Sequence, residues 1–370
     1  MSTMTALRPQ QLISELQSHG FRLEGRPSEI HTRRGGAGPS DHATVLIEGR
    51  PVMIPIHTGR ALNSPYLASP PDAAGQATVR RDGQTVARIA FARQPRFYRL
   101  QTLDGVPYSH IATLHSTDVL ATTVLQTCVR YQSRSKSCQF CSIGQSLAAG
   151  RTVAHKTPQQ LAEVARAAVL LDGVRHMVMT TGTPPTADRG ARVMCESAEA
   201  IRAAVDLPLQ AQFEPPDDFG WFRRVREAGV DSLGMHLEVL TPALRQRLMP
   251  GKAAIPVERY EEAFAAAVEV FGRGQVSTYI LAGLGDSRDT ILETCRRLVA
   301  LGVYPFVVPF VPISGTPLED HPAPDAAFMD AVLAPLAGML QEGGLSARGM
   351  KAGCGKCGAC SALSSYEVPA

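Results

Sequence analysis

From about residue 118 onward, six short β-like segments alternate with stretches that have helical periodicity. The expected strands lie at residues 120–127, 176–181, 209–213, 232–237, 277–281 and 304–310. The expected helices between them lie at residues 158–171, 189–205, 219–228, 258–271 and 289–301. Strands that alternate with helices form parallel sheets through right-handed crossovers. We therefore predict an α/β fold, a partial (β/α)6 TIM-like barrel, with its chemistry at the C-terminal ends of the strands.

The N-terminal part of the chain does not follow this alternation and predicts a small α+β accessory domain. It is expected to contain a helix at 9–19 and two β-hairpins at 43–56 and 77–91. A Gly-, Arg- and Pro-rich stretch at 25–41 is expected to be an exposed loop. After the barrel we expect a C-terminal helix and a Cys-rich segment that binds an auxiliary metal centre. The three predicted parts span residues 1–115, 116–322 and 323–370.

Composition excludes several classes of protein. Hydrophobic residues make up 44% of the chain, the mean hydropathy is −0.04 and the formal net charge is +3. Acidic and basic residues are interspersed, which argues against a nucleic-acid partner. The longest apolar run, 303–313, contains three prolines and is too short to span a bilayer, and residues 1–10 lack the apolar core of a signal peptide. We expect a soluble, cytoplasmic protein without a membrane partner.

Six of the eight cysteines fall into two tight groups. The first group is Cys128, Cys138 and Cys141, and the second is Cys354, Cys357 and Cys360. In a reducing compartment such groups indicate metal binding rather than disulfides.

The first cysteine group follows the first expected strand of the barrel, where barrel enzymes carry their active-site loops. Three thiolates would leave one iron of a [4Fe–4S] cluster without a protein ligand, and an open coordination position is a catalytic feature. The loop between Cys128 and Cys138 contains Arg130, Arg134 and Lys136 and no acid, and we expect these charges to favour thiolates. By spacing alone, a zinc site is equally compatible.

Cys138-x2-Cys141, with Phe140 before the last cysteine, resembles the signature of the radical S-adenosylmethionine (radical SAM) superfamily. Its usual spacing is C-x3-C-x2-C, so the first gap is longer here. Later segments resemble that superfamily in the same order along the chain. They are Thr181-Gly182-Thr183 after the second strand, Glu238 after the fourth, Gly283 after the fifth and residues 311–319 after the sixth. The last of these resembles biotin-synthase-like members, and the chain also resembles a bacterial family encoded beside a nitrilase.

This resemblance implies a radical SAM type of barrel with a [4Fe–4S] cluster on Cys128, Cys138 and Cys141. S-adenosylmethionine would bind the open iron and be cleaved by one electron to methionine and a 5′-deoxyadenosyl radical. That radical would abstract hydrogen from a small, nitrogen-containing substrate, and flavodoxin or ferredoxin would be the reducing partner. The cofactor contacts implied by the resemblance are Phe140, Thr181, Gly182, Thr183, Glu238, Lys252 and Gly283.

The second cysteine group is a C-x2-C-x2-C run with glycines between the thiols. A second iron–sulfur cluster is the favoured interpretation, because glycine lets the backbone wrap closely around a cluster. A zinc site and a redox-active tail are the alternatives. Three local thiolates would either leave an iron open to substrate or require a distant fourth ligand. The segment after the sixth strand is long enough to return this group to the mouth of the barrel.

Two other functions remain compatible with the sequence. One is a sulfur-inserting synthase that consumes the C-terminal cluster, and the other is a non-catalytic iron–sulfur or zinc protein for electron transfer or binding.

Several single residues carry weaker expectations. Glu214 follows the third strand and is expected to face the cavity, whereas function and core packing are equally favoured for His236. His110 and His115 precede the barrel and are expected to have packing or surface roles only. Cys295 shares an apolar helix stripe and is expected to be buried.

Overall fold

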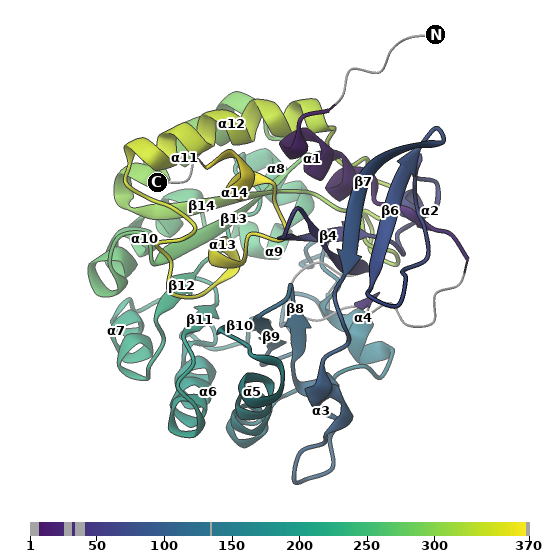
Figure 1. The fold of residues 1–370 in the computed structure, drawn as a ribbon. Helices are drawn as coiled ribbons and strands as arrows, with labels where there is room; N and C mark the ends of the chain where they lie inside the picture. Colours follow the sequence, from purple (N-terminus) through teal and green to yellow (C-terminus); the bar gives the residue numbers. More distant parts are fainter. Residues whose placement is uncertain (1–6, 26–31, 34–40, 134, 368–370) are drawn as a thin grey trace.

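The computed structural model describes residues 7–25, 32–33, 41–133 and 135–367, with Thr32 and Arg33 described by their backbone alone. Most of the loop predicted at 25–41, and Arg134, therefore lie outside the described residues. The described residues form two seven-stranded sheets, an antiparallel-rich N-terminal one and a largely parallel one, which lie side by side in Figure 1. One continuous hydrophobic core includes side chains from both.

Six parallel strands confirm the predicted partial barrel. Their order in the sheet is their order in the chain, so every crossover joins nearest neighbours. The strands are β9 (Val119–Thr123), β10 (His176–Thr180), β11 (Leu209–Gln212), β12 (Ser232–Gly234), β13 (Val276–Ala282) and β14 (Val303–Pro309). All seven residues of β14 are buried, as expected for a parallel strand covered on both faces.

Helices cover the outer face of this sheet (Figure 1). They are α5 (Pro158–Asp172), α6 (Ala191–Ala204), α7 (Gly220–Glu227), α10 (Val257–Phe271), α11 (Arg288–Leu301) and α12 (Ala326–Glu342). The start of α5 is fixed by a capping box between Thr157 and Gln160, and its end by Gly173 in the left-handed conformation. Shorter helices lie in the connections, namely α4 (Ile143–Ala148), α8 (Pro242–Leu248), α9 (Pro250–Ala253), α13 (Cys354–Cys357) and α14 (Leu363–Tyr366).

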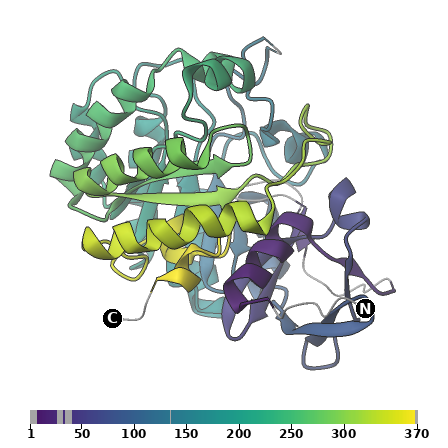
Figure 2. The same cartoon turned by 90° about the horizontal axis from the view of Figure 1, so that it is seen from above.

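The N-terminal region has the predicted helix and both predicted hairpins. Its elements are α1 (Pro9–His19), β1 (Arg22–Leu23), β2 (Thr32–Arg33), β3 (His42–Ile47), β4 (Arg50–Pro55), α2 (Gly59–Leu62), β5 (Tyr66–Ala68), β6 (Gln76–Arg81), β7 (Gln84–Phe91), η1 (Arg96–Arg99) and α3 (Tyr108–Ile111). The pairs β3–β4 and β6–β7 are antiparallel. Figure 2 shows α1 lying against α12, so this region packs on the C-terminal part of the chain.

The domain boundary predicted at residue 115 divides a hairpin. Strand β8 (Thr113–His115) pairs antiparallel with β9, from Thr113 opposite Ala121 to His115 opposite Val119. It therefore belongs to the barrel sheet. The sequence pattern missed this strand because it is only three residues long and precedes the alternation.

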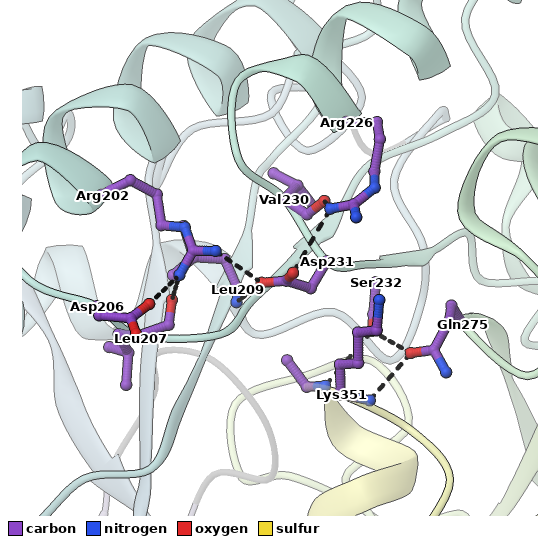
Figure 3. A network of polar contacts seen from close by, with 11 residues as sticks. Arg202, Asp206, Leu207, Leu209, Arg226, Val230, Asp231, Ser232, Gln275 and Lys351 are labelled. Atoms are coloured by element: carbon purple, nitrogen blue, oxygen red, sulfur yellow. Dashed lines mark hydrogen bonds and ion pairs between the residues drawn. The ribbon is translucent and has the colours of Figure 1, made fainter.

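The segment after the sixth strand is long enough to return the C-terminal tail to the mouth of the barrel, but the tail lies elsewhere. It crosses the other end of the sheet, where the strands begin. Gln275 Oε1 accepts hydrogen bonds from the Ser232 hydroxyl (3.0 Å) and the Lys351 N–H (2.9 Å), as Figure 3 shows. The N–H of Gly353 donates to His176 Nδ1, in the first residue of β10 (3.3 Å). Polar side chains at the strand starts thus bind the tail backbone.

Arginines on the outer helices form ion pairs at the same end of the sheet (Figure 3). Asp231, just before β12, accepts the Leu209 N–H at 3.1 Å and lies 3.7 Å from Arg202 and 3.5 Å from Arg226.

In the described part of the chain, no helix is both long and apolar enough to cross a bilayer.

Candidate active site

The first cysteine group lies at the C-terminal end of the sheet, as predicted, in a loop that pairs with the loop after β10. The Gly182 N–H donates to Leu125 O (2.8 Å), and the Val129 N–H donates to Thr183 O (2.9 Å). A Cβ on Gly182 would stand 2.1 Å from Thr127 O, so only glycine permits this approach. The loop carrying Cys128 is therefore held on the segment that the resemblance marks as glycine-rich.

Cys138 and Cys141 are held by a separate set of contacts. The Gln139 N–H donates to Leu248 O (2.8 Å), at the end of α8, and Cys138 and Phe140 pack on an apolar cluster that includes Leu248. The N–H of Gly251 donates to Lys136 O (3.0 Å), which fixes the start of α9 on the cysteine loop.

All three thiols open into one cavity of about 330 Å³. Six of the seven predicted cofactor contacts also line it, namely Phe140, Thr181, Gly182, Thr183, Glu238 and Lys252. Gly283 does not line it. Gly283 has φ of 101°, and a Cβ there would stand 2.7 Å from Pro324 Cδ, so the requirement for glycine comes from the backbone turn and its packing.

Lys252 and Glu238 form a buried ion pair in this cavity. The Lys252 Nζ donates to Glu238 Oε2 at 2.8 Å. Burial alone would lower the pKa of Lys252, but the Glu238 carboxylate more than compensates, and the pKa is raised. Glu238 itself has φ of 64°, an uncommon value for a residue with a side chain, where the chain leaves β12 and bridges to Ile280.

Three basic residues of the loop were expected to favour thiolates. Arg130 is ion-paired with Glu214, Lys136 is exposed, and Arg134 lies outside the described residues. Burial raises the pKa of Cys141 to about 12 and holds that of Cys138 well above its usual value, while Lys252 is the cation that opposes this rise. Desolvation outweighs the charges, so these thiols would become thiolates on binding a metal centre, with their protons released to solvent.

Glu214 lies in the wall of the same cavity, as predicted. One carboxylate oxygen, Oε1, accepts from Arg130, whereas Oε2 is buried without a hydrogen-bond partner. A buried carboxylate oxygen without a partner is costly. It is a position where a ligand that donates hydrogen bonds would be stabilised.

The residues around this cavity fit an iron–sulfur cluster together with a charged organic cofactor. Three cysteines supply the soft ligands that iron–sulfur clusters take. Lys252 and the Glu214 oxygen supply a cation and an acceptor for the carboxylate and the donor groups of a ligand, and the volume lies in the range of small-ligand sites. Within the described ranges, no three His, Cys or acidic side chains are close enough to hold a single ion.

A second cavity of about 280 Å³ adjoins the first inside the barrel. Phe140, Thr180 and Glu238 line both. Apolar side chains dominate its walls, with uncharged polar groups and the Glu238 carboxylate between them. Its polar residues include Gln212, His236 and Tyr279 from the barrel, and Gln17 and His42 from the N-terminal region.

Cys354 and Cys360 line the second cavity. The Gln212 Nε2 group donates to Cys354 Sγ at 3.2 Å, and Tyr279 shares a hydrogen bond with the same sulfur. Cys360 Sγ lies 3.5 Å from His115 Nε2. All eight cysteines lie in the described part of the chain, and none forms a disulfide.

His236 is a cavity residue with both ring nitrogens engaged. Its Nε2 bonds Gln212 Oε1 (3.0 Å) and its Nδ1 accepts the Tyr279 N–H (3.2 Å). Burial lowers the pKa of His236 to about 3, so the ring is neutral. This ring orients Gln212, which in turn binds Cys354.

The expectation for His115 is incomplete, because its side chain lines the second cavity beside Cys360. Sequence reasoning also missed Gln212 and Tyr279. Both lie on expected strands, but no pattern distinguishes an inward polar side chain that binds a thiol from one that satisfies a core hydrogen bond. Cys295 is fully buried on α11, as predicted.

Comparison with known proteins identifies related sequences. Residues 134–298, which include Cys138 and Cys141, match the model of the radical SAM superfamily. Over 213 residues the chain is 29% identical to the bacteriochlorophyllide c C-7(1)-hydroxylase of Chlorobaculum limnaeum, covering 52% of this chain and 53% of the relative. The chain thus spans about half the length of this curated relative.

Solved structures show a more distant likeness. Methylornithine synthase has a TM-score of 0.46 at 18% identity, over 59% of this chain and 60% of that one. A radical SAM methyltransferase from Sphaerobacter thermophilus has a TM-score of 0.47 at 15% identity, over 77% of each chain.

Proposed function

Residues 134–298 form a radical SAM superfamily domain, and on this premise we propose that the chain reductively cleaves S-adenosylmethionine at a [4Fe–4S] cluster held by Cys128, Cys138 and Cys141. The observation that carries the proposal is that these three thiols share one cavity with the buried Lys252–Glu238 pair. Three ligands for four irons leave one position for the cofactor.

When bound, the cluster and S-adenosylmethionine supply a 5′-deoxyadenosyl radical that abstracts hydrogen from a substrate. The chain's own residues bind and orient. Lys252, kept protonated by Glu238, presents a cation to the cofactor carboxylate. Glu214 Oε2 presents an acceptor to the amine or to a ribose hydroxyl. Phe140 lines both cavities and would place an apolar ring beside the bound cofactor.

The second cavity is the proposed substrate site. It adjoins the first, and its walls are apolar with Gln and His side chains that bind neutral groups. We expect a small, nitrogen-containing molecule there. The named relative acts on a bacteriochlorophyllide. We take from this likeness the type of cofactor and not the substrate.

A second iron–sulfur cluster on Cys354, Cys357 and Cys360 is part of the proposal. Its support is the placement of Cys354 and Cys360 at the second cavity, in contact with Gln212, Tyr279 and His115. A one-electron reductant such as flavodoxin or ferredoxin would supply the electron. A cytoplasmic location would keep both groups of thiols reduced.

The first prediction tests radical formation. Anaerobically reconstituted, dithionite-reduced protein should convert S-adenosylmethionine to 5′-deoxyadenosine and contain about eight irons per chain. The Cys128→Ala, Cys138→Ala and Cys141→Ala triple variant should retain about four irons and produce 5′-deoxyadenosine only at the protein-free background. Mass spectrometry and iron assays give both results.

Cys195→Ala is the matched control, because Cys195 lies on α6 outside the lining of either cavity. It should keep the wild-type iron content and activity. Zinc at the first cysteine group, or wild-type protein that makes no 5′-deoxyadenosine, would contradict the proposed function.

A further inference from the structure

His115 lies where the C-terminal tail meets the barrel sheet. It is the last residue of β8, its exposed fraction is 3%, and that of Cys360 is 8%. Its Nε2 lies 3.5 Å from Cys360 Sγ. About 245 residues separate the two in sequence, so the contact depends on the whole fold. A buried imidazole beside a buried thiol in a three-cysteine group is a metal-ligand arrangement.

The other two cysteines of the group face the same region. Cys354–Cys357 forms the single turn α13, in which the Gly358 N–H donates to Cys354 O (2.9 Å). Gly358 then adopts the left-handed conformation and turns the chain toward Cys360. Cys354 lines the second cavity together with Cys360 and His115. His115 lies at the start of the β8–β9 turn, which is therefore beside Cys360.

Three other histidines lie near the second cysteine group. Both ring nitrogens of His236 are engaged, with Gln212 and with the Tyr279 backbone. His176 Nδ1 accepts the N–H of Gly353. His42 lines the same cavity as Cys354 and Cys360, but the contact of 3.5 Å with the Cys360 sulfur is that of His115 Nε2.

We infer that His115 is the fourth ligand of the iron–sulfur cluster on Cys354, Cys357 and Cys360. The inference rests on the second cluster of the proposed function. Three thiolates and one imidazole close the coordination of this cluster, so no iron is open to substrate. Closed ligand sets are structural or carry electrons, whereas open ones are catalytic. The second cysteine group would then relay electrons or shape the cavity, and would not bind or donate atoms to the substrate.

The test isolates the second cluster. The full chain carrying Cys128→Ala, Cys138→Ala and Cys141→Ala is reconstituted anaerobically with iron and sulfide and then reduced. Pulsed electron paramagnetic resonance of the reduced cluster should show strong coupling to a ligand nitrogen, and labelling with ¹⁵N-histidine should change that coupling as expected for the isotope. This measurement needs no substitution at His115.

His115→Cys should keep about four irons and lose the nitrogen coupling, because a thiolate replaces the imidazole. His115→Ala should fall to about three irons, with the spectrum of a three-iron cluster. His155→Asn is the matched control, because His155 is exposed and lines neither cavity, and it should keep both the iron content and the nitrogen coupling of the triple-alanine protein.

The inference would be overturned if the triple-alanine protein showed no coupling to a histidine nitrogen. It would also be overturned if this coupling persisted when His115→Cys was added. Zinc in place of iron at this site would overturn it as well. The background lacks the first cluster, so these results do not depend on S-adenosylmethionine cleavage. The inference about His115 and the proposed function can therefore fail separately.

Discussion

Two buried lysines in this chain have opposite electrostatic surroundings. Lys252 is paired with Glu238, and its pKa is raised. Lys156 has an exposed fraction of 1%, donates to Gln126 Oε1 (3.1 Å) and Val153 O (2.9 Å), and has its pKa lowered to about 7 by desolvation. Gln126 in turn donates to Ile143 O (2.9 Å), two residues after Cys141. Lys156 thus supports the first cysteine loop while its own charge is poorly solvated.

We predict that Lys156 makes the stability of the metal-free protein depend on pH. Below pH 7 both the folded and the unfolded chain hold this proton. Between the folded pKa of about 7 and the ordinary value of 10.5, only the unfolded chain holds it. The free energy of unfolding should therefore rise with pH in this window, by up to about 1.4 kcal/mol per pH unit. In Lys156→Met, the free energy of unfolding should lack the part of this rise with pH that comes from Lys156.

Urea unfolding under anaerobic, reducing conditions, between about pH 7 and pH 9, measures the difference in slope. Lys351→Met, at an exposed lysine near the second cysteine group, is the control and should keep the wild-type slope. Equal slopes in wild type and Lys156→Met would show that Lys156 is hydrated in solution.

At the scale of the elements, the site depends on how closely two loops approach at the ends of β9 and β10. Gly182 allows the contact with Thr127 O, and the backbone bonds on either side continue the pairing of the strands beyond their ends. The strand–helix alternation predicted which elements form and where they end. It could not predict that these loops touch, because that distance depends on the twist and register of the sheet.

Gly182→Ala should therefore destabilise the protein by about 1–3 kcal/mol, since a methyl group at 2.1 Å from a backbone oxygen forces the loops apart. Iron bound at the first cysteine group should fall, while iron at the second group remains. Thermal unfolding and iron assays in the Cys354→Ala, Cys357→Ala and Cys360→Ala background separate the two effects.

Gly338→Ala provides the comparison. Gly338 lies on the exposed side of α12 with open space around its Cα, so alanine should be neutral or stabilise by about 0.5–1 kcal/mol. A Gly182→Ala protein with full iron content and unchanged stability would mean that the loops relax without cost.

At the scale of the whole molecule, the N-terminal region packs on the C-terminal part of the chain, with α1 beside α12 (Figure 2). Ala359 O, in the second cysteine group, accepts the Met53 N–H (2.8 Å) and the Gln17 side-chain amide (3.1 Å). Arg8 pairs with Asp330 at the surface of the same contact (2.8 Å). The N-terminal region therefore holds the C-terminal tail in place and closes one wall of the second cavity.

Gln17→Glu should lower the free energy of unfolding by about 2 kcal/mol or more at neutral pH. A buried carboxylate cannot donate to Ala359 O and is placed against a carbonyl oxygen. The loss should diminish at low pH, where the carboxyl group is protonated and can donate. Arg8→Ala removes a surface ion pair and should cost no more than about 1 kcal/mol. Denaturant unfolding of both variants compares them, and equal effects would mean that the Ala359 contact does not hold the two ends together.

The sequence alone determined the parallel sheet, its helices, both N-terminal hairpins and the grouping of the cysteines, because these follow from periodicity, turn residues and local spacing. Six of the seven residues expected at the cofactor also lie in one cavity with Cys128, Cys138 and Cys141. They are found in the connections that follow the parallel strands, and these connections converge at the C-terminal end of the sheet. Only the tertiary structure decided that the tail crosses the starting end of the strands and that His115 faces Cys360. It also decided that Arg130 is neutralised by Glu214. These contacts join residues far apart in the chain through polar side chains inside the fold, and no local pattern encodes which buried polar groups will find one another.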